Sequence, residues 1–261
     1  MDSIKTSPIM ENEHVKELLE LMETNNSLGR KDLLAVISQV AAMESHLATM
    51  VMELAVMRKE LAEARQVNSP TKATMQKVVI AMQSQILELR DKLAELKQDV
   101  IDGCKSAIAK CKEKGLSALR NITEYFNIKP RLESMRDILD NSIKQDNKMI
   151  SRIEAMSVEY HEAERHLKNI GRAFAGKEAI QEIKPVGKLA KAIEAPIKTD
   201  RACLLAMRNC INNAIGGLNR LENAERKPPI METINKLNKQ IAQSQRDAPI
   251  VERQKPCRTE R

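Results

Sequence analysis

The dominant pattern along the chain is a pair of long apolar ladders, separated by a short polar break at Asn68-Ser69-Pro70. In both ladders the apolar positions recur in alternating steps of four and three residues, which is the spacing of a coiled-coil seam. Two such seams joined by a turn predict an antiparallel helical hairpin. The sixteen seam positions, none of them polar, are Val36, Val40, Met43, Leu47, Met50, Leu54, Met57, Leu61, Met75, Val79, Met82, Ile86, Leu89, Leu93, Leu96 and Val100.

The first ladder predicts a helix from about Asp32 to Gln66. Ser69 as a cap and Pro70 as the first helical residue predict the start of a second helix, which continues through about Ile101. The first helix carries more apolar residues than a two-stranded seam needs. A bundle of three or more helices, or an oligomer, is expected to bury the surplus.

A third long helix is expected from about Arg131 to Ile170, again with apolar positions in steps of three and four. Ser142 and Asp146 interrupt its ladder. Polar residues in a seam can fix the register of a coiled coil. A local kink or an exposed face is equally compatible with these two residues.

The other apolar patterns are short, and none has the alternating period of a half-buried strand. The fold class is therefore all-α: a long antiparallel coiled-coil hairpin followed by further long and short helices, elongated or bundle-like. Expected shorter elements are a helix from residue 10, a helix at 116–126, a connector at 171–176, a short helix at 177–182, a piece at 186–195 between Pro185 and Pro196, a helix from Thr199-Asp200 to the pair Pro228-Pro229, and a weak helix at 230–241. The expected organisation is a disordered lead (1–9), an N-terminal helix plus hairpin (10–130), a C-terminal helical region (131–243) and a disordered basic tail (244–261).

The composition favours thin helical packing over a thick globule. Aromatic residues make up only 2% of the chain, and 14 methionines take their place among the apolar residues. No uninterrupted apolar run approaches the length of a transmembrane helix, and the first 20 residues lack the pattern of a secretory signal. The five cysteines are an odd number. Together these features predict a cytoplasmic protein with reduced thiols.

The cysteines form two pairs with the same spacing of seven residues, Cys104 with Cys111 and Cys203 with Cys210. On one helix this spacing separates the thiols by about 10 Å. Two thiolates on one zinc ion lie at most ~4.6 Å apart, so neither pair can hold a metal on a straight helix. Cross-pairing between the two helices stays open if they pack antiparallel. Burial as small apolar side chains is the favoured interpretation.

The histidines do not form a known metal site. His161 and His166 are five residues apart, whereas a zinc-protease helix needs four. Glu11 and His14 have the spacing of a di-iron motif, but no second copy occurs. There is no phosphate-binding glycine loop and no nucleophile elbow. The sequence therefore predicts no cofactor, no small-molecule substrate and no enzymatic activity.

The net charge of +7 is concentrated in two segments. Residues 103–130 carry 6 basic and 2 acidic residues, and residues 226–261 carry 9 basic and 4 acidic ones. Phosphate contacts need only such charges, although aromatics that would stack on single strands are absent from the tail. A solvated basic face is favoured over a nucleic-acid site. The candidate phosphate contacts are Lys105, Lys110, Lys112, Lys114, Arg120, Arg253, Lys255 and Arg258.

Two stretches carry a resemblance to known proteins: Met10 to Met22 (MENEHVKELLELM) and Asn169 to Glu178 (NIGRAFAGKE). With the long ladder between them, they resemble an uncharacterised family of helical proteins carried on conjugative or integrative mobile elements of gut bacteria. The resemblance covers the chain from Met10 and brings no known activity and no functional residues. It implies a bacterial cytoplasmic accessory protein of a mobile element.

These patterns together favour a non-enzymatic coiled-coil interaction or scaffold protein. Its apolar seams would pair with further copies in a homo-oligomer or with a helical protein partner. The alternative is a nucleic-acid-associated accessory protein that uses the basic segments 103–131 and 226–261. Contact with an anionic membrane surface through residues 171–176 ranks below both.

Overall fold

The computed structural model describes residues 8–27, 29–63, 69–181, 188–226 and 237–240. Within these ranges the chain is helical and has no strand, which confirms the all-α class. The elements in chain order are the 3-10 helix η1 (Ile9–Glu11), α1 (Glu13–Thr24), α2 (Arg30–Glu63), α3 (Ser69–Lys114), the 3-10 helix η2 (Leu116–Tyr125), α4 (Lys129–Phe174) and α5 (Lys188–Arg226).

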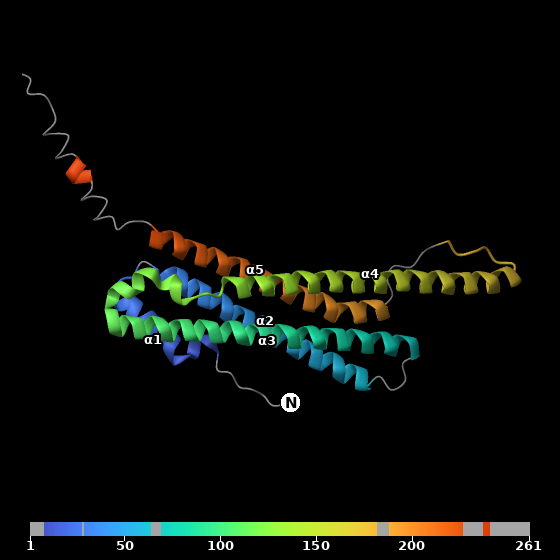
Figure 1. Cartoon of the computed structure of the whole chain (residues 1–261). Coiled ribbons are helices and arrows are strands. Elements are labelled where there is room, and N and C mark those ends of the chain that lie inside the picture. The colour runs from blue at the N-terminus through green and yellow to red at the C-terminus, as the bar shows by residue number, and fades with distance from the viewer. Residues whose placement is uncertain (1–7, 28, 64–68, 182–187, 227–236, 241–261) are drawn as a thin grey trace, which may run out of the picture.

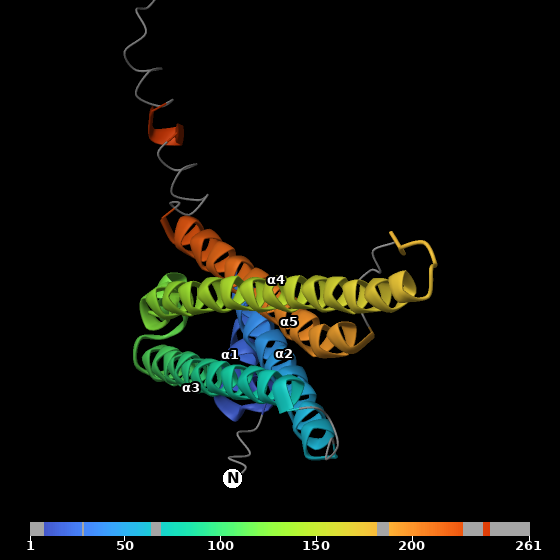
Figure 2. The same cartoon turned by 90° about the vertical axis from the view of Figure 1, so that its right-hand side faces the viewer.

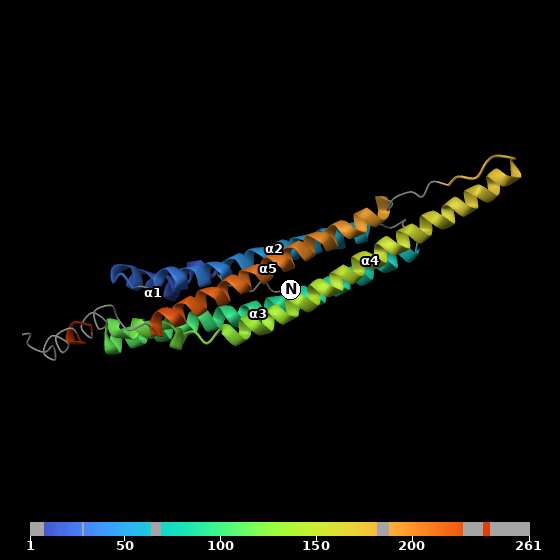
Figure 3. The same ribbon diagram turned by 90° about the horizontal axis from the view of Figure 1, so that it is seen from above.

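The four long helices form an elongated up-down-up-down arrangement (Figure 1). α2 and α4 run in one direction, and α3 and α5 run in the other. α2 packs most extensively against α5, α5 also packs against α4, and α2 also packs against α3. α1 lies on α3 near one end of the bundle. Figure 3, the view from above, shows that the helices together form a shape elongated along one axis.

The two apolar ladders of the sequence form much of the core. Of the sixteen seam positions, fourteen are buried, and the other two, Leu61 and Met75, are partly buried against the same core. α3, the other half of the predicted hairpin, packs against α2, but α5 covers more of α2 than α3 does. A third helix on α2 accounts for part of the apolar surplus noted above, since α2 buries one side against α3 and another against α5.

Two glycines allow unusually close packing between elements. A Cβ atom on Gly217 of α5 would lie 2.7 Å from Cγ2 of Val36, and a Cβ atom on Gly103 of α3 would lie 2.7 Å from the carbonyl oxygen of Tyr125. Such distances are well inside van der Waals contact, so both positions need a residue without a side chain. Gly217 therefore sets how closely α5 approaches α2.

α5 is one continuous helix through Pro196, which corrects the expected separation into a short piece and a new helix at residue 199. A proline inside a helix removes one backbone hydrogen bond and costs about 3 kcal/mol. The burial of Ile193 and Ile197 on either side of the proline favours the helical path despite this cost.

α4 continues through Gly171 to Phe174, where a connector had been expected, and residues 177–181 are not helical although a short helix had been expected there. The end of α4 is a Schellman motif. The N–H of Lys177 donates to the carbonyl of Arg172 at 2.9 Å, and Gly176 adopts a positive φ of 66°. Glycine supplies this left-handed conformation without steric cost, which is why the helix ends at the second glycine and not the first.

α2 is also long and apolar enough, by length and composition alone, to cross a membrane. It is one such helix among the described residues, and one side of it packs against α3 and α5. A core helix of a globular protein has the same composition, so this finding does not by itself indicate a membrane span. Of the expected disordered lead (1–9), Ile9 lies in η1 and is buried, which corrects that boundary, and residues 1–7 lie outside the described residues. The expected disordered tail (244–261) also lies outside the described residues.

Candidate functional site

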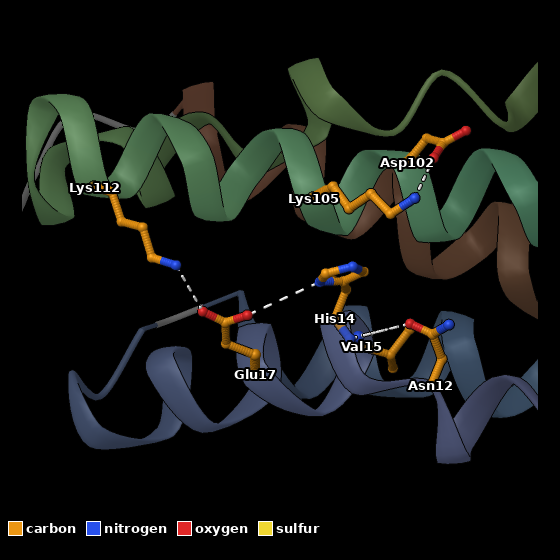
Figure 4. Close-up of polar contacts among 7 residues, drawn as sticks. All are labelled: Asn12, His14, Val15, Glu17, Asp102, Lys105 and Lys112. Atoms are coloured by element: carbon orange, nitrogen blue, oxygen red, sulfur yellow. Dashed lines mark hydrogen bonds and ion pairs between the residues drawn. The ribbon is translucent and has the colours of Figure 1, made fainter.

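The basic segment 103–130 places its lysines beside carboxylates (Figure 4). Nζ of Lys112 lies 3.0 Å from Oε1 of Glu17 on α1, and Nζ of Lys105 lies 3.2 Å from Oδ1 of Asp102 one turn away. Lys110 is likewise 2.7 Å from Glu113. Three of the candidate phosphate contacts are therefore already paired with acids.

The pKa shifts agree with these pairings. Hydrogen bonds from Gln98 and then Lys105 lower the pKa of Asp102, and the Glu113 carboxylate raises the pKa of Lys110. Both shifts favour the charged forms of Asp102 and Lys110, as expected of groups that are paired with opposite charges. The candidates Lys114 and Arg120 are exposed. Arg253, Lys255 and Arg258 lie outside the described residues, so the tail half of this interpretation stays a prediction.

The four cysteines of the two pairs are buried and free. α3 and α5 run in the same direction, so the antiparallel cross-pairing considered above does not occur. Burial raises the pKa of Cys104 to about 12 and also raises the pKa of Cys203 and Cys210. These thiols are protonated and unreactive at neutral pH, as expected of cysteines that pack as small apolar side chains.

Two of the four histidines lie near acids. Nδ1 of His14 lies 3.9 Å from Glu17, and Nδ1 of His161 lies 3.5 Å from Glu164. In the part of the chain that the structure describes, no three or more histidine, cysteine or acidic side chains converge in a group that could hold a metal ion.

A shallow hollow of about 470 Å³ lies where α3, η2 and the start of α4 meet. Its cation, Arg131, bridges two acids of α3: Nη1 lies 2.7 Å from Glu95, and Nε contacts Asp99. The charged groups of this hollow therefore join α3 to α4.

The exposed apolar residues of α4 form a continuous stripe along its outer half. They continue the four-three ladder of the helix and lie on one face of it. We call this surface the α4 stripe: Met156, Tyr160, Ala163, Leu167, Ile170 and Phe174. The five large side chains are 58%, 71%, 71%, 55% and 90% exposed, in chain order. This half of α4 extends past the ends of α3 and α5, as Figures 1 and 2 both show.

The segment that follows α4 folds back along the helix on the side away from the stripe. The N–H of Ile180 donates to Oδ1 of Asn169 at 2.7 Å, and Nδ2 of Asn169 donates to the carbonyl of Ile180 at 3.0 Å. Nε of Arg172 donates to the carbonyl of Glu178 at 2.6 Å. At roughly 100° per residue, Asn169 and Arg172 lie roughly 160–220° around the helix from the stripe. The returning segment thus leaves the stripe uncovered.

A pair of buried acids lies between α4 and α5. Asp146 and Asp200 are both fully buried, and none of their four carboxyl oxygens has a hydrogen-bond partner of good geometry. Burial raises the pKa of Asp146 to about 7 and, with the nearby Asp146 carboxylate, that of Asp200 to about 8. Arg201 pulls the pKa of Asp146 in the opposite direction. At neutral pH the pair therefore holds at least one proton, which the two carboxyl groups can share.

Sequence reasoning found the ladder that contains the α4 stripe, but it had no signal for the exposure of the outer half. It noted Asp146 as an interruption of an apolar ladder and Asp200 as a helix start. The two acids are far apart in the chain, and only the antiparallel packing of α4 on α5 brings them together. An acid on an apolar face was the one available signal for the pair.

Comparison with known proteins agrees with the part of the resemblance that concerns an uncharacterised family. No curated protein and no solved structure matches the chain. A model of a family of unknown function matches residues 11–256, which is nearly the full length. The chain therefore belongs to the family of unknown function DUF6674.

Proposed function

We propose that this protein is a non-enzymatic helical interaction protein, and that the α4 stripe is the surface on which its partner helix docks. The observation that supports the proposal is the exposure of six consecutive ladder positions, of which five carry large apolar side chains. A four-three ladder is the pattern by which helices bind helices. Fourteen of the sixteen seam positions, by contrast, are buried within the chain, and partner binding by the seam stays a prediction.

The exposed apolar area of the stripe is large for a surface that binds nothing. Soluble proteins rarely leave contiguous apolar patches larger than a few hundred Å² in contact with water. The exposed fractions of the five large side chains correspond to roughly 700 Å², if each fully exposed side chain and its backbone present about 200 Å². Covering this area with a helix is the simplest way to remove it from water.

The charges around the stripe favour a protein partner over an anionic surface. Arg172 and Arg165 donate to the backbone of the returning segment, on the opposite side of α4. Lys168 pairs with Glu164. These three cations of the outer half of α4 are thus engaged within the chain, whereas lipid or nucleic-acid phosphates would need unpaired ones.

The biological setting that we infer is an accessory role in a bacterial cytoplasm, on a mobile element. The resemblance of the two quoted stretches supports this setting. A small helical adaptor without an enzymatic site is compatible with it.

The test uses a fluorescein-labelled designed peptide of three heptads, with isoleucine at a and leucine at d, and the full chain at submicromolar concentration. We expect saturable anisotropy that changes little between low and high salt. Leu167→Glu should abolish this binding, whereas Ile80→Glu should not. Ile80 lies on α3 and is a matched control because it is 65% exposed, against 71% for Leu167.

Labelled duplex DNA is measured in parallel. Binding of DNA that falls steeply with salt, with no binding of the peptide, would replace this proposal with the nucleic-acid alternative. Peptide binding that Leu167→Glu leaves unchanged would place the docking surface elsewhere.

A further inference from the structure

We propose that the occupant of the α4 stripe is a second copy of this chain, whose own α4 stripe lies antiparallel against it. This inference rests on the proposed function and specifies its partner. Four features of the outer half of α4 support it: its register, its area, its position and its charges.

The register of the stripe is self-complementary. In an antiparallel pair centred on residue 165, each a position of one helix faces a d position of the other. Met156 then meets Phe174 of the second copy, and Tyr160 meets Ile170. At the centre the small Ala163 meets the larger Leu167, so wide and narrow residues alternate as knobs-into-holes packing requires. A parallel pair would instead place Ala163 against Ala163 and leave a gap between two bulkier layers.

The area of the stripe suits a dimer. The exposed surface of the five large residues, roughly 700 Å² on each copy with their backbone included, is close to the ~800 Å² per partner that a standard protein interface buries. All of it lies along about 27 Å of one helix, since α-helices rise about 1.5 Å per residue between Met156 and Phe174. A second stripe of the same length covers it from end to end.

The position of the stripe permits the contact. The outer half of α4 extends beyond α3 and α5 (Figures 1, 2 and 3). The returning segment occupies the opposite side of the helix through Asn169 and Arg172. In the antiparallel pair the two bundles lie at opposite ends of the shared region, so neither body meets the other.

The charges at the centre of the pair are balanced. Glu164 and Lys168 lie on the same edge of the stripe, where they form an ion pair within one chain. The antiparallel register brings the two Glu164 side chains to the same edge of the pair, and each keeps Lys168 of its own chain as its partner. These two ion pairs offset the repulsion between the two glutamates.

Sedimentation velocity of the full chain from 1 to 100 µM tests the inference. We expect a monomer–dimer equilibrium with dimer dominant at the upper end. Leu167→Glu places two charges in the interface, one per copy, and should weaken association by more than about 100-fold. Ile80→Glu should leave association unchanged. Far-UV circular dichroism checks that both variants fold, which is expected because both side chains are largely exposed.

The register is tested by mixing the Ala163→Cys and Leu167→Cys proteins under mild oxidation. Antiparallel pairing should favour the mixed disulfide by about tenfold or more over either homodimer, whereas a parallel pair would favour the homodimers. Homodimers in excess would overturn the antiparallel model.

A wild-type chain that stays monomeric at 100 µM, or a dimer that Leu167→Glu leaves intact, would overturn self-pairing. The proposed function is judged separately by the designed peptide, so a monomer that binds the peptide would retain helix docking and lose only the second copy. The last experiment is flotation of the protein with phosphatidylserine vesicles. If the wild-type chain is a monomer that floats with the vesicles and Leu167→Glu does not float, the stripe binds a lipid surface instead of a second copy.

Discussion

The buried pair Asp146 and Asp200 predicts that the fold is less stable at neutral pH than in mild acid. An aspartate in an unfolded chain titrates near pH 4. In the folded chain burial raises the pKa of Asp146 to about 7 and that of Asp200 to about 8. Between these limits the folded state keeps protons that the unfolded state has released. Unfolding therefore becomes easier as the pH rises from 4 towards 7–8, and the dependence ends above that range.

The magnitude follows from proton linkage. Each proton held only by the folded state lowers the free energy of unfolding by about 1.4 kcal/mol per pH unit. For one retained proton the loss between pH 5 and pH 7 is therefore about 3 kcal/mol, and the second carboxyl group adds to it. Arg201 on α5 acts on Asp146, and the charge of Glu53 on α2 acts on Cys203, which lies three residues after Asp200. Arg201 reduces the effect and does not reverse its sign.

The measurement is urea unfolding of wild type and Asp200→Asn from pH 5 to pH 8. Asparagine has nearly the same shape and does not titrate. The stability of the variant relative to wild type should therefore rise by about 3 kcal/mol between pH 5 and pH 7.5, and the variant should show at most half of the wild-type pH slope. Asp137→Asn on the exposed face of α4 is the control, and it should keep the wild-type slope. A wild-type stability that is flat or rises between pH 5 and pH 7, measured relative to Asp200→Asn, would refute the reasoning.

Three further predictions concern single contacts. Gly217→Ala should lower the free energy of unfolding by about 1–3 kcal/mol, because its Cβ would lie 2.7 Å from Cγ2 of Val36. Chemical denaturation measures this free energy, and an unchanged midpoint would mean that α5 can move away from α2 to make room. Lys97→Met should lower the free energy of unfolding by about 2 kcal/mol. The buried amine lies 2.6 Å from the half-buried Glu44 carboxylate, which loses this partner in the variant. If the loss of stability disappears in the double variant with Glu44→Gln, the Lys97–Glu44 pair is its cause. Asn169→Ala should speed proteolysis within residues 175–181 several-fold with little change in global stability, because both hydrogen bonds that hold Ile180 are lost. Limited trypsin digestion followed by mass spectrometry reads the site of cleavage, and an unchanged rate there would show that Arg172 and Arg165 suffice to hold the segment.

The sequence predicted the long helices well because their apolar spacing is regular. α2 was expected at about 32–66 and occupies Arg30–Glu63, and α4 was expected at about 131–170 and occupies Lys129–Phe174. The same spacing also predicted burial along α2 and α3, where fourteen of sixteen seam residues are buried. The period of the apolar residues shows that a helix has an apolar face, so this property could be predicted from the sequence.

Periodicity does not report what covers the face. The ladder of α4 has the same spacing in its inner half, which α5 covers, and in its outer half, which extends beyond the bundle. Nothing in the sequence distinguishes Ile153, which is buried, from Leu167, which is exposed. The helical continuity of α5 through Pro196 was missed for a related reason, since the packing of neighbouring isoleucines on the core outweighs a local preference. The meeting of Asp146 with Asp200 depends on tertiary packing and has no local signal.

The extensive packing of α2 against α5 also has a consequence for synthesis of the chain. α2 ends at Glu63 and α5 ends at Arg226, so the ribosome completes the main partner of α2 long after α2 itself. At about 5–20 residues per second, this delay is roughly ten to thirty seconds. During that time the side of α2 that α5 will cover, including Val36 opposite Gly217, has only the helices already made to shield it. A nascent chain with such an interval is a natural client for a chaperone at the ribosome exit, and an aborted chain that ends before α5 would be prone to aggregation.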